Sequence, residues 1–187
     1  MKSIIKYIII FSSLFCFPEA KSAETLYLYK GTFSRTIKIE ELYEFKKTKI
    51  PSSKLQNLIN ITNQNRKDLY KILSYEIDLP LKTSSKLMNS RIGEVFLGRL
   101  SKIVYPNKIL DRKIGTKAIR SGLLISSYNN NQKINLIDFF KAYPNKDIAI
   151  DLNALGKALQ KADFLKELIK FYSDSPFKKL KEGSSSI

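Results

Sequence analysis

The sequence predicts a mostly helical α+β domain, in which about seven helices surround a small sheet of short strands. Three observations support this prediction. Apolar residues recur at helical spacing through most of the chain, they alternate with a period of two in only a few short stretches, and no internal repeat divides the chain. A hydrophobic content of 43% is enough for a core, and about 165 residues after the leader are enough for one domain. We expect that domain at 23–174, followed by a basic, serine-rich tail at 175–187.

Residues 1–22 have the pattern of a signal peptide. Lys2 and Lys6 form a basic start, residues 7–17 are mostly apolar, and small side chains follow at Ala20 and Ser22. The apolar core of about ten residues is shorter than the roughly 20 that a membrane-spanning helix needs. We therefore expect cleavage after Ser22 and export across a membrane; an uncleaved N-terminal anchor is the alternative. Cys16 would leave with the peptide, so the mature chain would have no thiol.

The mature chain opens with LYLYKGTFSRTIKIEEL at 26–42, which predicts a hairpin followed directly by a helix. Apolar residues alternate with polar ones at both ends of this stretch, which is typical of strands. Gly31 supplies a turn residue that can adopt positive φ. The helix is expected at 39–47, with Leu42, Tyr43 and Phe45 turned inward.

Most of the remaining chain is expected to be helical. The spacing of apolar residues predicts helices within the segments 55–62, 69–73, 92–104, 117–128, 136–143 and 152–172. A further short helix is expected at 84–89, where Thr83 or Ser84 would cap it, and a polar, basic loop at 106–116.

Two further strands are expected, because apolar and polar residues alternate at 75–79 and at 147–150. Pro80 places the first of these at an edge or ends it. Together with the opening hairpin, the two strands are expected to form the single small sheet of the domain.

The positive charge of the chain is large, at +16 in full and +14 once three lysines and one glutamate leave with residues 1–22. It is carried by 27 lysines and only 6 arginines, which are spread along the chain. Recognition of nucleic acid relies on the arginine fork, and export would separate the protein from nucleic acid. We therefore expect no nucleic-acid partner. The charge is interpreted as a solvated surface, with attraction to an anionic membrane or an acidic partner as the alternative.

The sequence contains few groups that could carry out catalysis. It has no histidine, which is the commonest general base and metal ligand. There is no Gly-x-Ser-x-Gly elbow, and the stretch GTKAIRSG lacks the ending of a phosphate-binding loop. A serine and a lysine stand at Ser-x-x-Lys spacing in 175–178, but within the expected tail. We predict no catalytic residue and no cofactor.

Carboxylates form two candidate pairs. Asp147 and Asp151 flank the strand expected at 147–150, and Glu76 and Asp78 share one face of the strand expected at 75–79. Either pair could in principle bind a metal or act as acid and base. We interpret Asp151 as the N-cap of the next helix and the others as solvated charges, so no metal site is predicted.

The clearest amphipathic helix is the last one. Its apolar stripe includes Leu155, Leu159, Leu165, Leu168 and Tyr172, at a spacing close to a heptad. Such a stripe is usually part of a core. The alternative is that these five side chains form a face for binding a partner.

Three stretches together resemble a known family. They are LYLYKGTFSRTIKIEEL, KLMNSRIGEVFLGRL and AIRSGLLISSYNNNQKINLIDFFKAYPNKDIAIDLNAL, and they cover most of residues 25–160 in order. The chain is similar to the domain of unknown function that precedes the catalytic domain in exported α/β-hydrolase-family proteins of cyanobacteria. The resemblance implies location in the periplasm or the thylakoid lumen. It transfers no catalytic residue, and we expect the catalytic half to be absent because the sequence stops at Ile187.

These observations favour an exported, non-catalytic interaction module that binds another exported protein, for example a hydrolase. A protein that binds lipid or a membrane surface is the first alternative. A hydrolase, as the label of the family implies, is the second.

Overall fold

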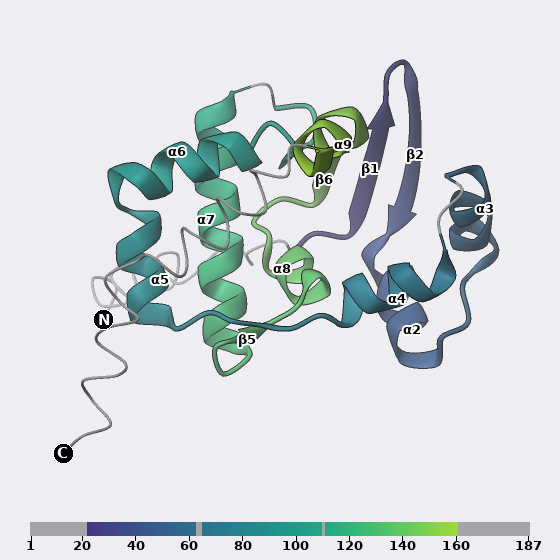
Figure 1. Cartoon of the computed structure of the whole chain (residues 1–187), viewed down its shortest axis with the longest axis horizontal. Helices are drawn as coiled ribbons and strands as arrows, with labels where there is room; N and C mark the ends of the chain where they lie inside the picture. Colours follow the sequence, from purple (N-terminus) through teal and green to yellow (C-terminus); the bar gives the residue numbers. More distant parts are fainter. Residues whose placement is uncertain (1–21, 63–64, 110, 161–187) are drawn as a thin grey trace, which may run out of the picture.

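The computed structural model describes residues 22–62, 65–109 and 111–160, and it shows a mostly helical α+β fold (Figure 1). The strands in these ranges are β1 (Thr25–Lys30), β2 (Phe33–Lys38), β3 (Ile77–Asp78), β4 (Val104–Pro106), β5 (Lys133–Ile134) and β6 (Asp147–Asp151). The helices are α2 (Ile39–Thr48), α3 (Ser53–Ile61), α4 (Arg66–Ser74), α5 (Leu81–Met88), α6 (Arg91–Leu100), α7 (Arg112–Asn129), α8 (Leu136–Ala142) and α9 (Leu152–Gln160). The predicted fold class is confirmed.

The main sheet has four strands in the order β2-β1-β6-β4. The strands β1 and β2 form the predicted hairpin, and Gly31 adopts a φ of 62° in the two-residue turn between them. β6 lies parallel to β1, with Ile148 beside Leu26, and β4 lies antiparallel to β6. Leu26, Ile37 and Ile148 are therefore neighbours on one face of the sheet, and all three are buried.

Local side chains explain where most helices begin. Asn65 caps α4 by accepting from the Lys67 amide, and Ser52 caps α3 by accepting a hydrogen bond from the Leu55 amide. The amide oxygen of Asn135 accepts from two backbone N–H groups at the start of α8. Each of these caps satisfies donors that would otherwise be left without a partner.

The core joins the sheet to the helices around α7 and α8. Tyr143, at the end of α8, is fully buried, and its ring meets that of Phe139 edge to face at 5.7 Å. The two helices approach closely because Gly122 faces Phe139; a Cβ at Gly122 would lie 3.1 Å from that ring. The fold therefore depends on a small residue in the middle of α7.

Part of the predicted sheet is wrong. Of the strand expected at 75–79, only the two residues of β3 form a strand, and they pair with β5 in a separate sheet. The fourth strand of the main sheet is instead β4, in a segment that was predicted to contain the end of a helix and the start of a loop. The helix expected at 92–104 ends at Leu100, because the chain must turn there before it can pair with β6.

Some helix details also differ from the prediction. The loop expected at 106–116 ends early, since α7 begins at Arg112. The helix expected at 84–89 begins at Leu81 after Pro80, whose fixed φ suits a helix start, so neither predicted cap is used. Tyr43 points outward and is 38% exposed.

Within the described ranges, no helix is both long enough and apolar enough to cross a membrane. The predicted signal peptide at 1–22 and tail at 175–187 lie outside these ranges, except for Ser22.

Candidate functional site

An open apolar groove lies where four distant segments of the chain meet. We call it the apolar groove. It has a volume of about 350 Å³, and its lining includes Ile72, Tyr75, Ile77, Leu100, Leu123 and Phe139. The side chains come from the end of α4 and β3, the end of α6, the middle of α7, and the start of α8. This is the kind of concave surface on which binding usually depends.

One wall of the apolar groove is formed by apolar side chains that remain in contact with water. Ile72 is 56% exposed, Tyr75 is 71% exposed and Ile77 is 45% exposed. The chain leaves α4 at Tyr75 with an extended backbone, at φ −67° and ψ 123°, and the next side chains therefore alternate to either side of it. The opposite wall is formed by α7 and α8 and is part of the packed core.

The apolar groove offers very little polar chemistry. Apart from the backbone and the tyrosine hydroxyl, its polar side chain is that of Asn135. The amide oxygen of Asn135 is already engaged, because it accepts from Ile137 and Asp138 at 3.0 and 3.2 Å. The groove can therefore bury apolar groups, but its lining provides no nucleophile activated by a base.

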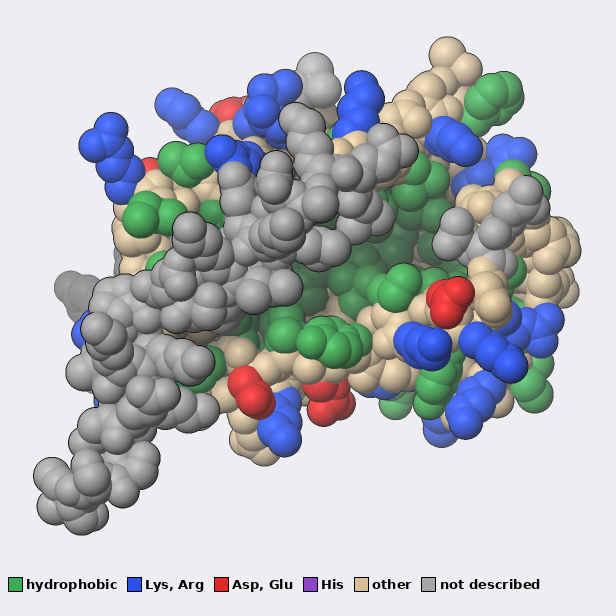
Figure 2. Space-filling view, in the orientation of Figure 1, with side chains coloured by type: hydrophobic (Ala, Val, Ile, Leu, Met, Phe, Trp, Pro, Cys, Tyr) green, Lys and Arg blue, Asp and Glu red, His purple; other side chains and the backbone are tan. Residues whose placement is uncertain are grey.

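Charge and hydrophobic groups are separated on the surface. Figure 2 shows hydrophobic side chains gathered in a hollow at the centre of one face, over the place of α8 and β6 in Figure 1. Lysine and arginine side chains lie around the edge of the same face. On this face the basic residues are thus at the rim, and the centre is suited to apolar contact.

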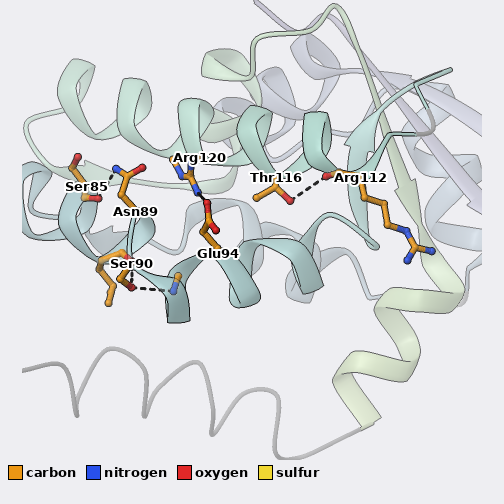
Figure 3. Close-up of polar contacts among 9 residues, drawn as sticks. Ser85, Asn89, Ser90, Glu94, Arg112, Thr116 and Arg120 are labelled. Carbon is orange, nitrogen blue, oxygen red and sulfur yellow. Dashed lines mark hydrogen bonds and ion pairs between the residues drawn. The ribbon is translucent and has the colours of Figure 1, made fainter.

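The motif LMNSRIG forms a tight corner between α5 and α6. The Ser90 hydroxyl donates to the Leu87 carbonyl at 2.6 Å and accepts from the Gly93 N–H at 3.1 Å (Figure 3). Asn89 donates to the Ser85 carbonyl at 2.8 Å. A Cβ at Gly93 would lie 2.1 Å from the Leu87 carbonyl oxygen, so no larger residue fits there. This motif therefore has a structural role.

The stretch that begins AIRSGLL places Arg120 on α7, opposite Glu94 on α6. Their side chains point toward each other, and the guanidinium lies 3.4 Å from the carboxylate (Figure 3). The Arg120 side chain is 19% exposed and that of Glu94 is 66% exposed, so water screens the pair. The pair ties α6 to α7, the two helices that carry Leu100 and Leu123 of the apolar groove.

The candidate carboxylate pairs have structural or solvated positions. Asp151 accepts from the Asn153 and Ala154 amides at 2.8 and 2.9 Å, which confirms it as the N-cap of α9. Glu76 and Asp78 are exposed, Glu76 just before the short strand β3 and Asp78 within it. In the part of the chain that the structure describes, no three acidic, histidine or cysteine residues are grouped so that they could hold a metal.

Sequence reasoning missed a tyrosine cluster on the second face of the main sheet. The Tyr29 hydroxyl donates to the Asn107 amide oxygen at 2.9 Å, although the two residues are 78 positions apart. Burial, with smaller effects from Asp151 and Tyr29, raises the pKa of Tyr105 above its ordinary value. No local pattern could reveal this cluster, because its members meet only through the pairing of β1, β6 and β4.

The predicted partner-binding stripe is only partly visible. Leu155 is half-buried on α9, and Leu159 belongs to the same helix. Leu165, Leu168 and Tyr172 lie outside the described residues. Their proposed role as a binding face therefore stays a prediction.

Comparison with known proteins gives one clear finding about the domain. The model of the protein family described as alpha/beta hydrolase of unknown function (DUF1400) matches residues 22–151. This span runs from the start of β1 to the end of β6 and contains the whole lining of the apolar groove. No curated protein and no solved structure gave a significant match.

Proposed function

Since the chain belongs to this family of alpha/beta hydrolases of unknown function, we propose that it is a non-catalytic module that binds another protein. In this proposal the protein is exported and binds another exported protein, such as a hydrolase. Apolar side chains of the partner enter the apolar groove. The observation that carries the proposal is the groove itself, with its exposed wall at Ile72, Tyr75 and Ile77.

Two further observations support an interaction role over turnover. The chain contains no histidine, so it cannot assemble the usual serine–histidine pair of a hydrolase from its own residues. The groove lining is apolar apart from Asn135 and the tyrosine hydroxyl. Tyrosine is an effective anchor in protein interfaces, because its ring buries a large area while its hydroxyl stays hydrated.

Site-directed photo-crosslinking tests the proposal. A photoreactive phenylalanine analogue replaces Tyr75 in one preparation and Ile50 in a control, since Ile50 is an equally exposed apolar residue (74% exposed) that does not line the groove. We expect one exported protein to be crosslinked from position 75 only. The purified partner is then expected to bind the native chain, and Tyr75→Glu to weaken binding by about tenfold or more.

Several results would overturn the proposal. Equal crosslinking from positions 50 and 75 would show non-specific contact, and equal affinity for native protein and Tyr75→Glu would place the partner elsewhere. Ile50→Glu serves as the matched control for charge, and circular dichroism shows whether each variant is folded. Turnover of short acyl esters by homogeneous native protein would argue for the hydrolase function instead.

A membrane-surface role is a second candidate, favoured by α6. Its Ile92 and Val95 side chains are 68% and 55% exposed, next to the exposed Arg91. Apolar and basic side chains on one helix suit an anionic lipid surface. Flotation with phosphatidylglycerol vesicles, compared with phosphatidylcholine vesicles across salt, tests this role, and equal absence from both vesicle fractions at low salt would exclude it.

A further inference from the structure

We propose that the free edge of β2, together with α3, is a second binding site, which takes an extended acidic peptide as a fifth strand of the main sheet. This site is separate from the apolar groove and shares no lining residue with it. We call it the edge groove. The inference does not depend on the proposed function.

The edge groove is open, with a volume of about 590 Å³, and it runs along the side of a strand. Four consecutive residues of β2, 34–37, line it on one side, and Lys54, Asn57, Leu58 and Ile61 of α3 line the other. Successive side chains of a strand point to opposite faces of the sheet. Four consecutive residues can therefore share one groove only if the edge of the strand, with its backbone, faces that groove.

The backbone of β2 has hydrogen-bonding groups to offer there. In the described structure β2 is the outermost strand, paired with β1 alone. The two-residue turn makes Lys30 and Phe33 the first hydrogen-bonded pair of the hairpin, and hydrogen-bonded pairs then alternate along it. The N–H and C=O groups of Ser34 and Thr36 consequently point away from β1, toward the edge groove. An added strand would meet these groups.

The side chains of the edge groove define the sequence that would bind. Arg35 and Lys54 are both exposed, and neither β2 nor α3 contains an acidic residue. The contact that the structure gives for the Arg35 guanidinium is with the carbonyl oxygen of neighbouring Ser34, at 3.1 Å. A peptide carboxylate would complement both cations, and rim charges of this kind mainly confer specificity.

Apolar side chains complete the recognition surface. Ile61 is 66% exposed and Leu58 is half-buried at the α3 side of the edge groove. An extended peptide that carries both acidic and apolar side chains would therefore place carboxylates near the cations and apolar groups against Leu58 and Ile61. A row of backbone donors and acceptors selects a polypeptide, because lipids and nucleic acids cannot extend a β-sheet ladder.

The probe is a fluorescein-labelled octapeptide of alternating valine and glutamate, measured by fluorescence anisotropy with the full mature chain. Two control peptides replace every glutamate by lysine, or methylate every backbone nitrogen while keeping the side chains. We expect binding of the glutamate peptide only. Hydrogen exchange at the Thr36 amide should slow when this peptide binds, because the amide would then donate to it.

Two kinds of variant separate the contribution of backbone hydrogen bonds to peptide binding from that of the two cations. Thr36→Pro removes the outward-facing N–H but leaves the pairing with β1 intact, and an edge strand tolerates proline. We expect it to weaken binding by about tenfold, whereas Thr36→Ala, the matched control, changes affinity less than about twofold. Arg35→Ala with Lys54→Ala should weaken binding by about fivefold, and Lys82→Ala on α5 should not.

Clear outcomes would overturn the inference. These are the absence of binding by the glutamate peptide, equal binding of the lysine or methylated peptide, and undiminished affinity in a folded Thr36→Pro protein. Binding of phosphatidylglycerol vesicles that is lost on Arg35→Ala with Lys54→Ala, without peptide binding, would assign the cations to a membrane instead. Tyr75→Glu should leave peptide affinity unchanged, so this test and that of the apolar groove can fail independently.

Discussion

Replacing each of two glycines of α6 by alanine should have opposite effects on stability. Gly93 and Gly98 are five residues apart in the same helix. A Cβ at Gly93 would lie 2.1 Å from the Leu87 carbonyl oxygen and 2.8 Å from the Met88 Cα, whereas a Cβ at Gly98 would meet nothing within 4 Å. The first contact is with backbone atoms, which cannot move aside as a flexible side chain could. The substitution is the same at both sites, so the difference isolates the α5–α6 corner.

The expected magnitudes follow from these contacts. Alanine in place of glycine within a helix gains up to about 1 kcal/mol, which is the whole effect expected for Gly98→Ala. At Gly93 the helix must shift away from α5, and overpacking of this kind costs about 1–3 kcal/mol. The shift also disturbs the Ser90 cap, worth about 1 kcal/mol. We expect Gly93→Ala to be destabilised by about 1–3 kcal/mol overall, so that the two variants differ by about 2–4 kcal/mol.

Urea unfolding of the mature protein, followed by circular dichroism, measures both values. The difference corresponds to roughly 5–15 °C in Tm for a domain of this size. If the free energy of unfolding falls with urea at the same slope in both variants and in the native protein, the substitutions have changed the stability of the folded state and not the compactness of the unfolded state. The reasoning is refuted if Gly93→Ala is as stable as Gly98→Ala.

Three further substitutions test the buried polar groups. Tyr143→Phe should stabilise the protein by about 1 kcal/mol at neutral pH, because the buried Tyr143 hydroxyl has no hydrogen-bond partner in the described structure. The substitution should also reduce the loss of stability at alkaline pH. Burial raises the pKa of Tyr143, so in the native protein the contribution of the neutral phenol to stability is fully present below about pH 10 and is lost as the pH rises further. Asn135→Ala should cost about 1–2 kcal/mol, since two amides of α8 lose their acceptor. Ser127→Ala should cost about 1–3 kcal/mol, because the Leu79 carbonyl loses a buried donor at 2.6 Å.

The same urea measurements check these values, with Tyr143→Phe repeated between pH 7 and pH 11. A Tyr143→Phe protein that is less stable than native at pH 7 would indicate a hydrogen-bond partner for the hydroxyl. Asn135→Asp keeps an acceptor at the start of α8 and should retain most of the stability, whereas Ser127→Thr tests whether the hydroxyl alone is sufficient.

Elements whose signal is local were largely predictable. The hairpin around Gly31 and the helix that follows it were predicted close to their observed limits, and α8 was predicted one residue too long. The N-cap at Asp151 was also predicted. Each depends on neighbouring residues in the sequence, through periodicity, turn chemistry or a cap.

The pairing of strands was not predictable in the same way. Val104, the first residue of β4, continues the apolar stripe of the preceding helix, and Pro106 reads as the start of a loop, so local spacing gives no strand signal there. They form a strand because β6 offers an edge that accepts them. The segment around Ile77, which alternates more clearly, pairs with β5 instead and stays short.

The sequence by itself determined the class of the fold, most helices and the absence of histidine chemistry, because composition and short-range periodicity encode these properties directly. Only the tertiary structure decided which strands pair, where Gly93 leaves no room for a side chain, and how Tyr75, Leu100, Leu123 and Phe139 meet in one groove. The strand pairing and the groove join residues tens of positions apart, and the Gly93 contact joins α6 to the end of α5. They depend on how the elements pack against each other, and no local pattern records that packing.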